Sequence, residues 1–179
     1  VFMLQHGRTV STRYTLVETL KESDSVAIAT YAGGIRKVLE PTYGDNKRQI
    51  HAAIDRLKSG GSTAMSSGLD LAYSMAWESF KKGAENRVVV MSDGDANVGR
   101  TSWKDMLNQI KGYADKGVTM STIGFGMGNY KDTRMEQLAN KGNGNYAYID
   151  TILEAKKVLV TEMAEGLEAF LEQHNYILL

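Results

Sequence analysis

The 179-residue sequence contains no cysteine, which excludes disulfides, thiolate metal sites and cysteine nucleophiles. It has a single proline, Pro41, and no apolar run near the ~18 residues that a membrane-spanning helix needs. Lysine and arginine total 21, as do aspartate and glutamate, so the formal net charge is zero. A sequence-independent nucleic-acid binder needs a basic excess to displace counterions. We therefore expect neither a nucleic-acid partner nor a membrane span in this chain.

The residues that are present are typical of a folded globular protein, with 42% hydrophobic and 23% charged. The length suits one domain, and no repeat, low-complexity stretch or linker divides it. We expect residues 1–179 to form a single domain. Because the chain begins with Val1 rather than Met, we also expect it to belong to a longer polypeptide that carries other domains.

Strand-like and helix-like segments alternate along the chain. Short apolar runs predict strands at Val1–Leu4, Val26–Tyr31, Arg87–Met91, Val118–Phe125 and Asn145–Ile149, with Ile35–Leu39 as a hairpin partner at one edge. Helical spacing predicts helices at Asn46–Leu57, Met65–Phe80, Trp103–Asp115, Asp132–Asn140 and Ile152 to about Leu171, and a short amphipathic stretch at Tyr14–Leu20. This alternation predicts an α/β fold: a doubly wound, mostly parallel sheet with helices on both faces and one antiparallel edge strand.

The clearest helix has apolar residues at three- and four-residue spacing, which we expect to be core: Met65, Leu69, Ala72, Tyr73, Ala76, Trp77 and Phe80. Either Ser62 or Thr63 is expected to cap its amino end. A helix that is apolar along one face packs that face against the sheet.

Three loops are candidates for the functional site, because open parallel sheets bind ligands beyond the carboxyl ends of their strands. They are residues 5–9, the acidic and glycine-punctuated residues 92–99, and residues 60–64, where a glycine pair leads into a helix. The last two loops supply hydroxyls and a carboxylate. Such oxygen ligands suit hard cations such as Mg²⁺.

Four motifs together resemble the von Willebrand factor type A domain: Ser92–Gly99, Gly60–Ala64, Gly124–Tyr130 and Gly142–Asp150. More narrowly, they are similar to the A domains of bacterial cell-envelope lipoprotein-like proteins. The resemblance implies a Rossmann-like fold and a metal-ion-dependent adhesion site. In that site Asp-x-Ser-x-Ser follows the first strand, a second loop supplies Thr and a third supplies Asp. A partner's carboxylate completes the metal shell. The resemblance also implies a periplasmic or cell-envelope location.

Carried over to this sequence, the resemblance assigns metal-ligand positions to Thr63 and Asp93. The first loop departs from the family pattern, because Gln5 stands where Asp is expected and Gly7 replaces the first Ser. Thr9 replaces the second Ser conservatively, so the implied metal set is Thr63, Asp93 and Thr9. Alternatively, the true first strand is missing and residues 1–9 have another role.

The departure has a cost for metal binding, since Gln5 carries no charge and Gly7 has no side chain. One charge pair at 4 Å is worth on the order of 4 kcal/mol gross at an effective dielectric near 20. We therefore expect Mg²⁺ binding to be weak or absent. The residues expected to contact a partner are Gln5, Ser62, Thr63, Asp93 and Asp95, although Asp95 also suits a loop residue that bonds neighbouring amides.

The leading functional hypothesis is a non-enzymatic module that binds a protein partner at the carboxyl ends of the strands, with an acidic side chain of that partner as a candidate contact. No nucleophile–base pair or Gly-x-Ser-x-Gly elbow points to catalysis. One alternative is an anion or phosphate binder that uses Gly60–Thr63 at a helix amino end. Another is a structural domain whose site has decayed.

Overall fold

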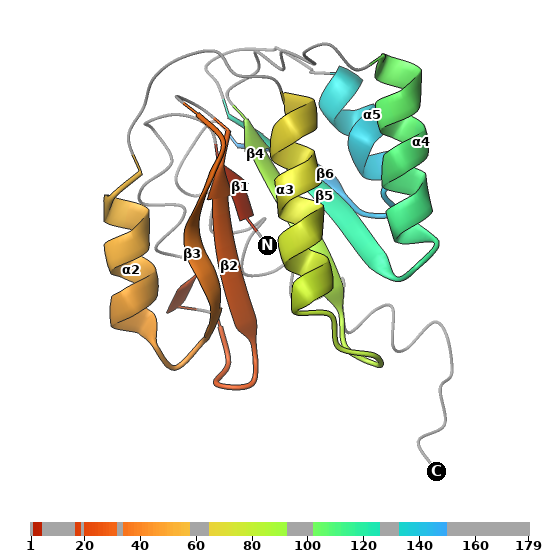
Figure 1. Cartoon of the computed structure of the whole chain (residues 1–179). Helices are drawn as coiled ribbons and strands as arrows, with labels where there is room; N and C mark the ends of the chain where they lie inside the picture. Colours follow the sequence, from red (N-terminus) through yellow and green to blue (C-terminus); the bar gives the residue numbers. More distant parts are fainter. Residues whose placement is uncertain are drawn as a thin grey trace.

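The computed structural model describes residues 2–4, 17–18, 20–31, 34–57, 65–92, 102–125 and 133–149. Within these ranges six strands form one sheet, and helices pack on it (Figure 1). The strands are β1 (Phe2–Leu4), β2 (Ser25–Thr30), β3 (Arg36–Tyr43), β4 (Asn86–Ser92), β5 (Val118–Phe125) and β6 (Tyr146–Ile149). The helices are α2 (Lys47–Asp55), α3 (Met65–Glu78), α4 (Trp103–Ala114) and α5 (Thr133–Lys141).

The strands lie in the order β3-β2-β1-β4-β5-β6. β1 pairs in parallel with both β2 and β4, and the parallel pairing continues through β5 to β6. Only β3, at one edge, runs antiparallel to its neighbour β2. The strand order reverses between β1 and β4, which is the switch point of a doubly wound sheet. The predicted fold class is confirmed.

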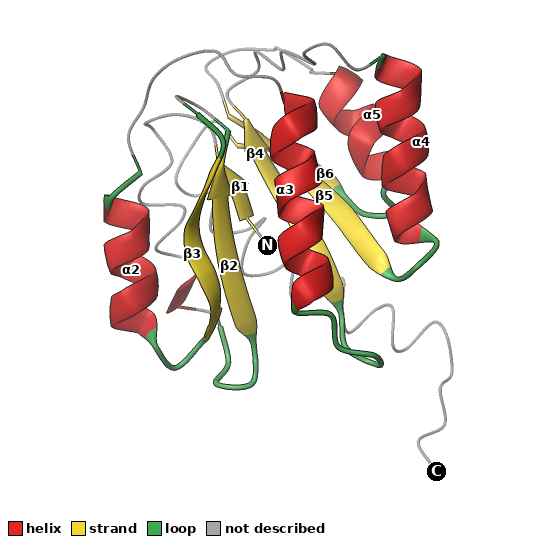
Figure 2. Ribbon diagram, in the orientation of Figure 1, coloured by secondary structure: helices red, strands yellow, loops and turns green. Residues whose placement is uncertain are grey.

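Helices cover the two faces of the sheet unequally, as Figure 2 shows. On one face, residues of α3, α4 and α5 share a buried cluster with Val88 and Val90 of β4. On the other face, Ile50, Ala53 and Ile54 of α2 share a cluster with Val89 of β4. Successive β4 residues therefore enter opposite cores, which explains why this strand has no polar alternation.

The segment before β2 is fixed to α2. Val17 is buried in the same cluster as Ile50, and the Lys47 ammonium donates hydrogen bonds to the carbonyls of Val17 and Leu20. His51 also lies 2.8 Å from a carboxylate oxygen of Glu18. Val17 and Glu18 are helical, which agrees with the amphipathic stretch predicted at this point.

Two sequence predictions need correction. Trp77 is not core: the residue is 49% exposed, because it lies at the margin of the apolar face of α3, where its ring packs against Phe80. The edge strand is longer than Ile35–Leu39 and runs through Pro41 to Tyr43. Proline fits there because its missing N–H falls on an edge strand.

Other predicted helix residues agree with the structure. Met65, Leu69, Ala72, Tyr73 and Ala76 are all buried. The predicted helix from Ile152 to about Leu171 lies outside the described residues. Within the described ranges, no helix is both long and apolar enough to cross a membrane.

Candidate functional site

The carboxyl ends of four parallel strands lie side by side at the switch point. Leu4, the last residue of β1, is in register with Thr30 of β2 on one side and with Met91 of β4 on the other. Ser92, which ends β4, is in register with Gly124 of β5. This is the edge at which open α/β sheets bind their ligands.

The residues that the sequence singles out follow or precede these ends, but they lie outside the described residues. They are Gln5, Gly7, Thr9, Ser62, Thr63, Asp93 and Asp95. In the sequence, Leu4 directly precedes Gln5 and Ser92 directly precedes Asp93. The structure therefore brings together the strand ends from which both segments leave.

The amino end of α3 packs at the same edge. Met65, the first residue of the helix, is fully buried and belongs to the same cluster as Tyr31 and Val90, near the carboxyl ends of β2 and β4. Thr63 precedes Met65 by two residues in the sequence. All three candidate loops thus adjoin elements that meet at one end of the sheet.

Two buried hydroxyl residues at this edge were not among the predicted site residues. Thr30 is 4% exposed at the end of β2, and Ser92 is fully buried at the end of β4, so they flank β1 on either side. Thr122, farther back along β5, donates a hydrogen bond from Oγ1 to the carbonyl of Met135 at 2.8 Å. The sequence feature that could have identified Thr30 and Ser92 is a polar residue at the carboxyl end of an otherwise apolar strand, where ligands bind in such sheets.

The donor chemistry is of the kind that Mg²⁺ accepts. Asp93 offers one carboxylate, Thr9 and Thr63 offer hydroxyls and Gln5 an amide oxygen. Mg²⁺ in proteins keeps several waters and commonly takes only one or two carboxylates. By type, these oxygen donors suit the ion, but only one of them is charged. Elsewhere, the described residues contain no group of three or more His, Asp or Glu side chains placed to hold a metal.

The strand order and the helices on both faces of the sheet define a doubly wound α/β fold. The sequence model of the von Willebrand factor type A domain matches residues 8–161, and the chain belongs to this family. The family commonly mediates protein–protein interactions.

The relatives include bacterial proteins. The chain is 47% identical over 152 residues to the uncharacterized protein YfbK of Escherichia coli (strain K12), covering 85% of this chain and 26% of that protein. The chain thus spans about a quarter of the length of that relative.

Solved structures share the fold at low identity. The conserved hypothetical protein BatB of Bacteroides thetaiotaomicron superposes with a TM-score of 0.72 at 18% identity, covering 90% of this chain and 87% of that one. Proximal thread matrix protein 1 from the mussel byssus, with a zinc-occupied MIDAS motif, gives a TM-score of 0.67 at 18% identity. That match covers 92% of this chain and 44% of the mussel chain.

Proposed function

We propose that this chain is a non-enzymatic module that binds a protein partner at the carboxyl edge of its sheet, with weakened dependence on a divalent metal. One observation carries the proposal: the register Thr30–Leu4–Met91 sets the ends of β2, β1 and β4 beside one another. Gln5 and Asp93 follow two of these adjacent ends. Membership of a family that commonly mediates protein interactions supports the same reading.

The metal-ligand residues of this proposal are Thr9, Thr63 and Asp93. A bound Mg²⁺ would supply a positive charge that attracts a partner's carboxylate. The zinc-occupied MIDAS motif of the mussel protein supports a divalent ion in this fold. With Gln5 and Gly7 in the first loop, Asp93 is the one carboxylate of the set, so a dication there is poorly neutralised. Affinity for the metal falls accordingly.

Recognition of the partner then rests mainly on hydrogen bonds and charge. The Gln5 amide and the hydroxyls of Ser62 and Thr63 are donors suited to a carboxylate of the partner. Asp93 and Asp95 can accept hydrogen bonds from donor groups that flank the partner's carboxylate. An acidic residue with neighbouring N–H or hydroxyl groups is therefore the partner chemistry that fits this residue set.

Calorimetric titration of Mg²⁺ and Mn²⁺ into chelator-stripped protein tests the metal part of the proposal. We expect weak binding that disappears in Asp93→Ala, because the one carboxylate of the set is lost. Asp95→Ala is the matched control, since it removes the same charge from the same loop, and binding should persist there. Micromolar affinity in the unmodified protein, or equal loss in both variants, would contradict the proposal.

A restoring variant keeps the test decisive when wild-type heat is too small to fit. Gln5→Asp with Gly7→Ser recreates the family's first-loop ligands. We expect this pair of changes to tighten Mg²⁺ binding about a hundredfold or more, because a second carboxylate faces the ion. Unchanged affinity would show that the first loop is not part of a metal site.

A further inference from the structure

A second surface lies at the other end of the parallel strands, opposite their carboxyl ends. There α3 and α4 end and β4 and β5 begin. It contains Trp77, Phe80, Lys81, Lys82, Tyr113 and Lys116, and we call it the aromatic–lysine surface. The Trp77 side chain is 49% exposed, while Phe80 and Tyr113 are half-buried. The proposed function uses none of these residues.

Ring contacts hold this surface together. The Trp77 and Phe80 rings lie 5.0 Å apart, and Phe80 reaches the turn after α4, where a Cβ on Gly117 would meet its ring at 3.6 Å. Tyr113 stacks on the buried Tyr73 with ring centroids 4.1 Å apart. The rings are thus fixed by packing before any partner binds, which lowers the entropy lost on binding.

Three lysines belong to this surface, at the ends of α3 and α4. The Lys116 ammonium lies 6.0 Å from the centre of the Tyr113 ring. The Lys81 ammonium lies 4.9 Å from the centre of the Tyr43 ring, at the end of the edge strand. Lys82 follows Lys81 and is exposed.

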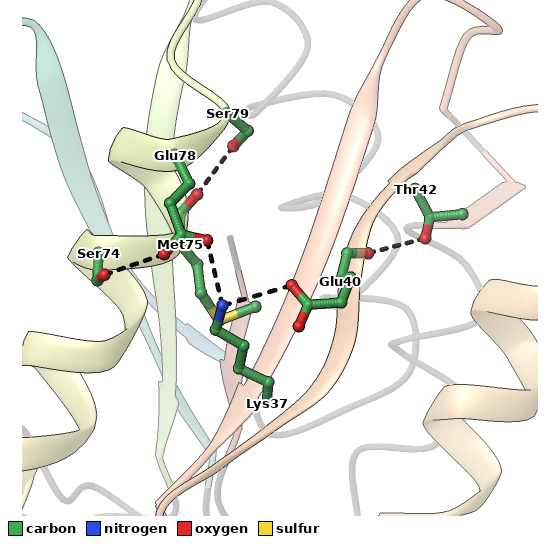
Figure 3. A network of polar contacts seen from close by, with 7 residues as sticks. All are labelled: Lys37, Glu40, Thr42, Ser74, Met75, Glu78 and Ser79. Carbon is green, nitrogen blue, oxygen red and sulfur yellow. Dashed lines mark hydrogen bonds and ion pairs between the residues drawn. The ribbon is translucent and has the colours of Figure 1, made fainter.

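The carboxylates nearest to these lysines in the sequence are already engaged by other cations. Glu78 accepts a hydrogen bond from Lys37 at 3.1 Å (Figure 3), and Glu78 is the main cause that raises the pKa of Lys37. Likewise, Glu85 pairs with Arg87 at 3.0 Å and Asp115 with Lys111 at 2.7 Å. Among the described residues, Lys81, Lys82 and Lys116 form no ion pair. Their charges are therefore uncompensated by any ion pair with a described residue.

We propose that the aromatic–lysine surface docks an acidic segment of a protein partner, with an apolar side chain against Trp77 and carboxylates beside the lysines. An aromatic centre with a charged rim is the usual anatomy of a protein interface, and tryptophan is enriched among the residues that dominate binding. Carboxylates complement the three uncompensated lysines.

Two other occupants fit less well. A second copy would bring like charges together across a two-fold axis, because each copy presents the same lysines. An anionic membrane surface is typically bound by clusters of about four to eight basic residues, more than the three found here. Both are outcomes that the experiment separates.

The two tryptophans of the chain provide the readout. Trp77 belongs to the surface, whereas the Trp103 indole N–H, at the start of α4, donates to Gln137 Oε1 at 2.9 Å. The probe is a synthetic Asp/Glu-rich peptide with one central Phe, added to ¹⁵N-labelled protein at low salt. We expect a saturable shift of the Trp77 indole signal and little change at Trp103. Equal shifts at both tryptophans, or no saturable shift, would overturn the proposal.

Charge reversal supplies the matched variants. Lys81→Glu with Lys116→Glu should weaken peptide binding about tenfold, since glutamates that repel the acidic peptide then replace two of the three lysines. Arg48→Glu with Lys104→Glu changes the net charge equally at exposed positions on α2 and α4, and should leave the affinity near the wild-type value. Equal loss in both variants would mean a non-specific charge effect. Concentration-dependent dimerisation without peptide would show that the surface binds a second copy of the chain and not an acidic segment. Binding to anionic vesicles but not to the peptide would show that it binds a membrane surface.

Discussion

Tyr73 has surroundings very different from water. Its side chain is fully buried on α3, and its hydroxyl has no hydrogen-bond partner among the described residues. Burial raises the pKa of Tyr73 well above the ordinary value, and the neighbouring Tyr113 raises it further. The phenol therefore stays protonated in the folded state when the unfolded state ionises.

Replacing this residue by Tyr73→Phe should raise the free energy of unfolding by about 1 kcal/mol at neutral pH, because an unpartnered hydroxyl leaves the core. The advantage should grow above pH about 10, the ordinary tyrosine pKa. There the unfolded wild type releases a proton that the folded state retains, so its stability falls as pH rises. Denaturant unfolding across pH measures both effects.

Tyr43→Phe is the control, since Tyr43 is 54% exposed on the edge strand. We expect that variant to unfold like the wild type at neutral pH. A loss of stability in Tyr73→Phe as large as a typical buried hydrogen bond would show that the hydroxyl has a partner after all.

At the scale of elements, the turn from α5 to β6 depends on backbone contact with β5. The Met120 amide donates to the Gly142 carbonyl at 2.8 Å, and the Gly144 amide donates to Ala139 at 3.0 Å. A Cβ on Gly144 would lie 2.1 Å from the Met120 carbonyl oxygen. The turn can pack this closely on β5 only because it has no side chain there.

Gly144→Ala should therefore lower the free energy of unfolding by about 2–3 kcal/mol, because the β5 backbone must move to admit a methyl group. Gly112→Ala is the matched control: a Cβ there meets nothing within 4 Å, in the interior of α4. Alanine at that position should stabilise by roughly 0.5–1 kcal/mol, since it loses less freedom on folding. Chemical denaturation of the two variants side by side tests the contrast, and losses of similar size would refute the contact argument.

The elements also show how far local pattern reaches. Spacing along α3 predicted its buried residues from Met65 to Ala76, because the helical period places them on one face. The same spacing put Trp77 in the core, although the structure leaves it half exposed. The helical period determines the direction in which a side chain leaves its helix. Its exposure to solvent depends on whether neighbouring helices and strands cover it. For the same reason the length of β3 escaped prediction: pairing with β2 extends it through Pro41.

At the scale of the whole molecule, the two proposed binding surfaces lie at opposite ends of the sheet. β5 has eight residues, so the edges are separated by about 25 Å of strand. Sites this far apart, with no shared partners, generally act additively.

Asp93→Ala should consequently leave the affinity for the acidic peptide within about twofold of wild type. Conversely, Trp77→Ala should leave the heat of Mg²⁺ binding unchanged. Titration of the acidic peptide into Asp93→Ala, and calorimetric titration of Mg²⁺ into Trp77→Ala, measure the two affinities beside those of the wild type. A change in either would mean that the two edges are coupled through the sheet.

The candidate site was predictable only in outline. Loops after strands, glycines before α3 and the Asp93 motif are local features, so the sequence placed Thr63 and Asp93 in candidate loops. Which loops adjoin one another depends on strand order, and only that order places Thr30 and Ser92 on either side of β1. All the predicted site residues, Gln5, Gly7, Thr9, Ser62, Thr63, Asp93 and Asp95, lie outside the described residues, so their roles remain proposals.

By itself, the sequence determined the alternation of strands and helices and the α/β class, because hydrophobic periodicity is a property of a few neighbouring residues. It also determined the family resemblance, because the four motifs are short local segments. Tertiary structure decided what lies beside what. It paired β1 with β4, more than 80 positions away in the chain, and left Trp77 half exposed. Those outcomes depend on packing between distant segments, whose free energy no local pattern encodes.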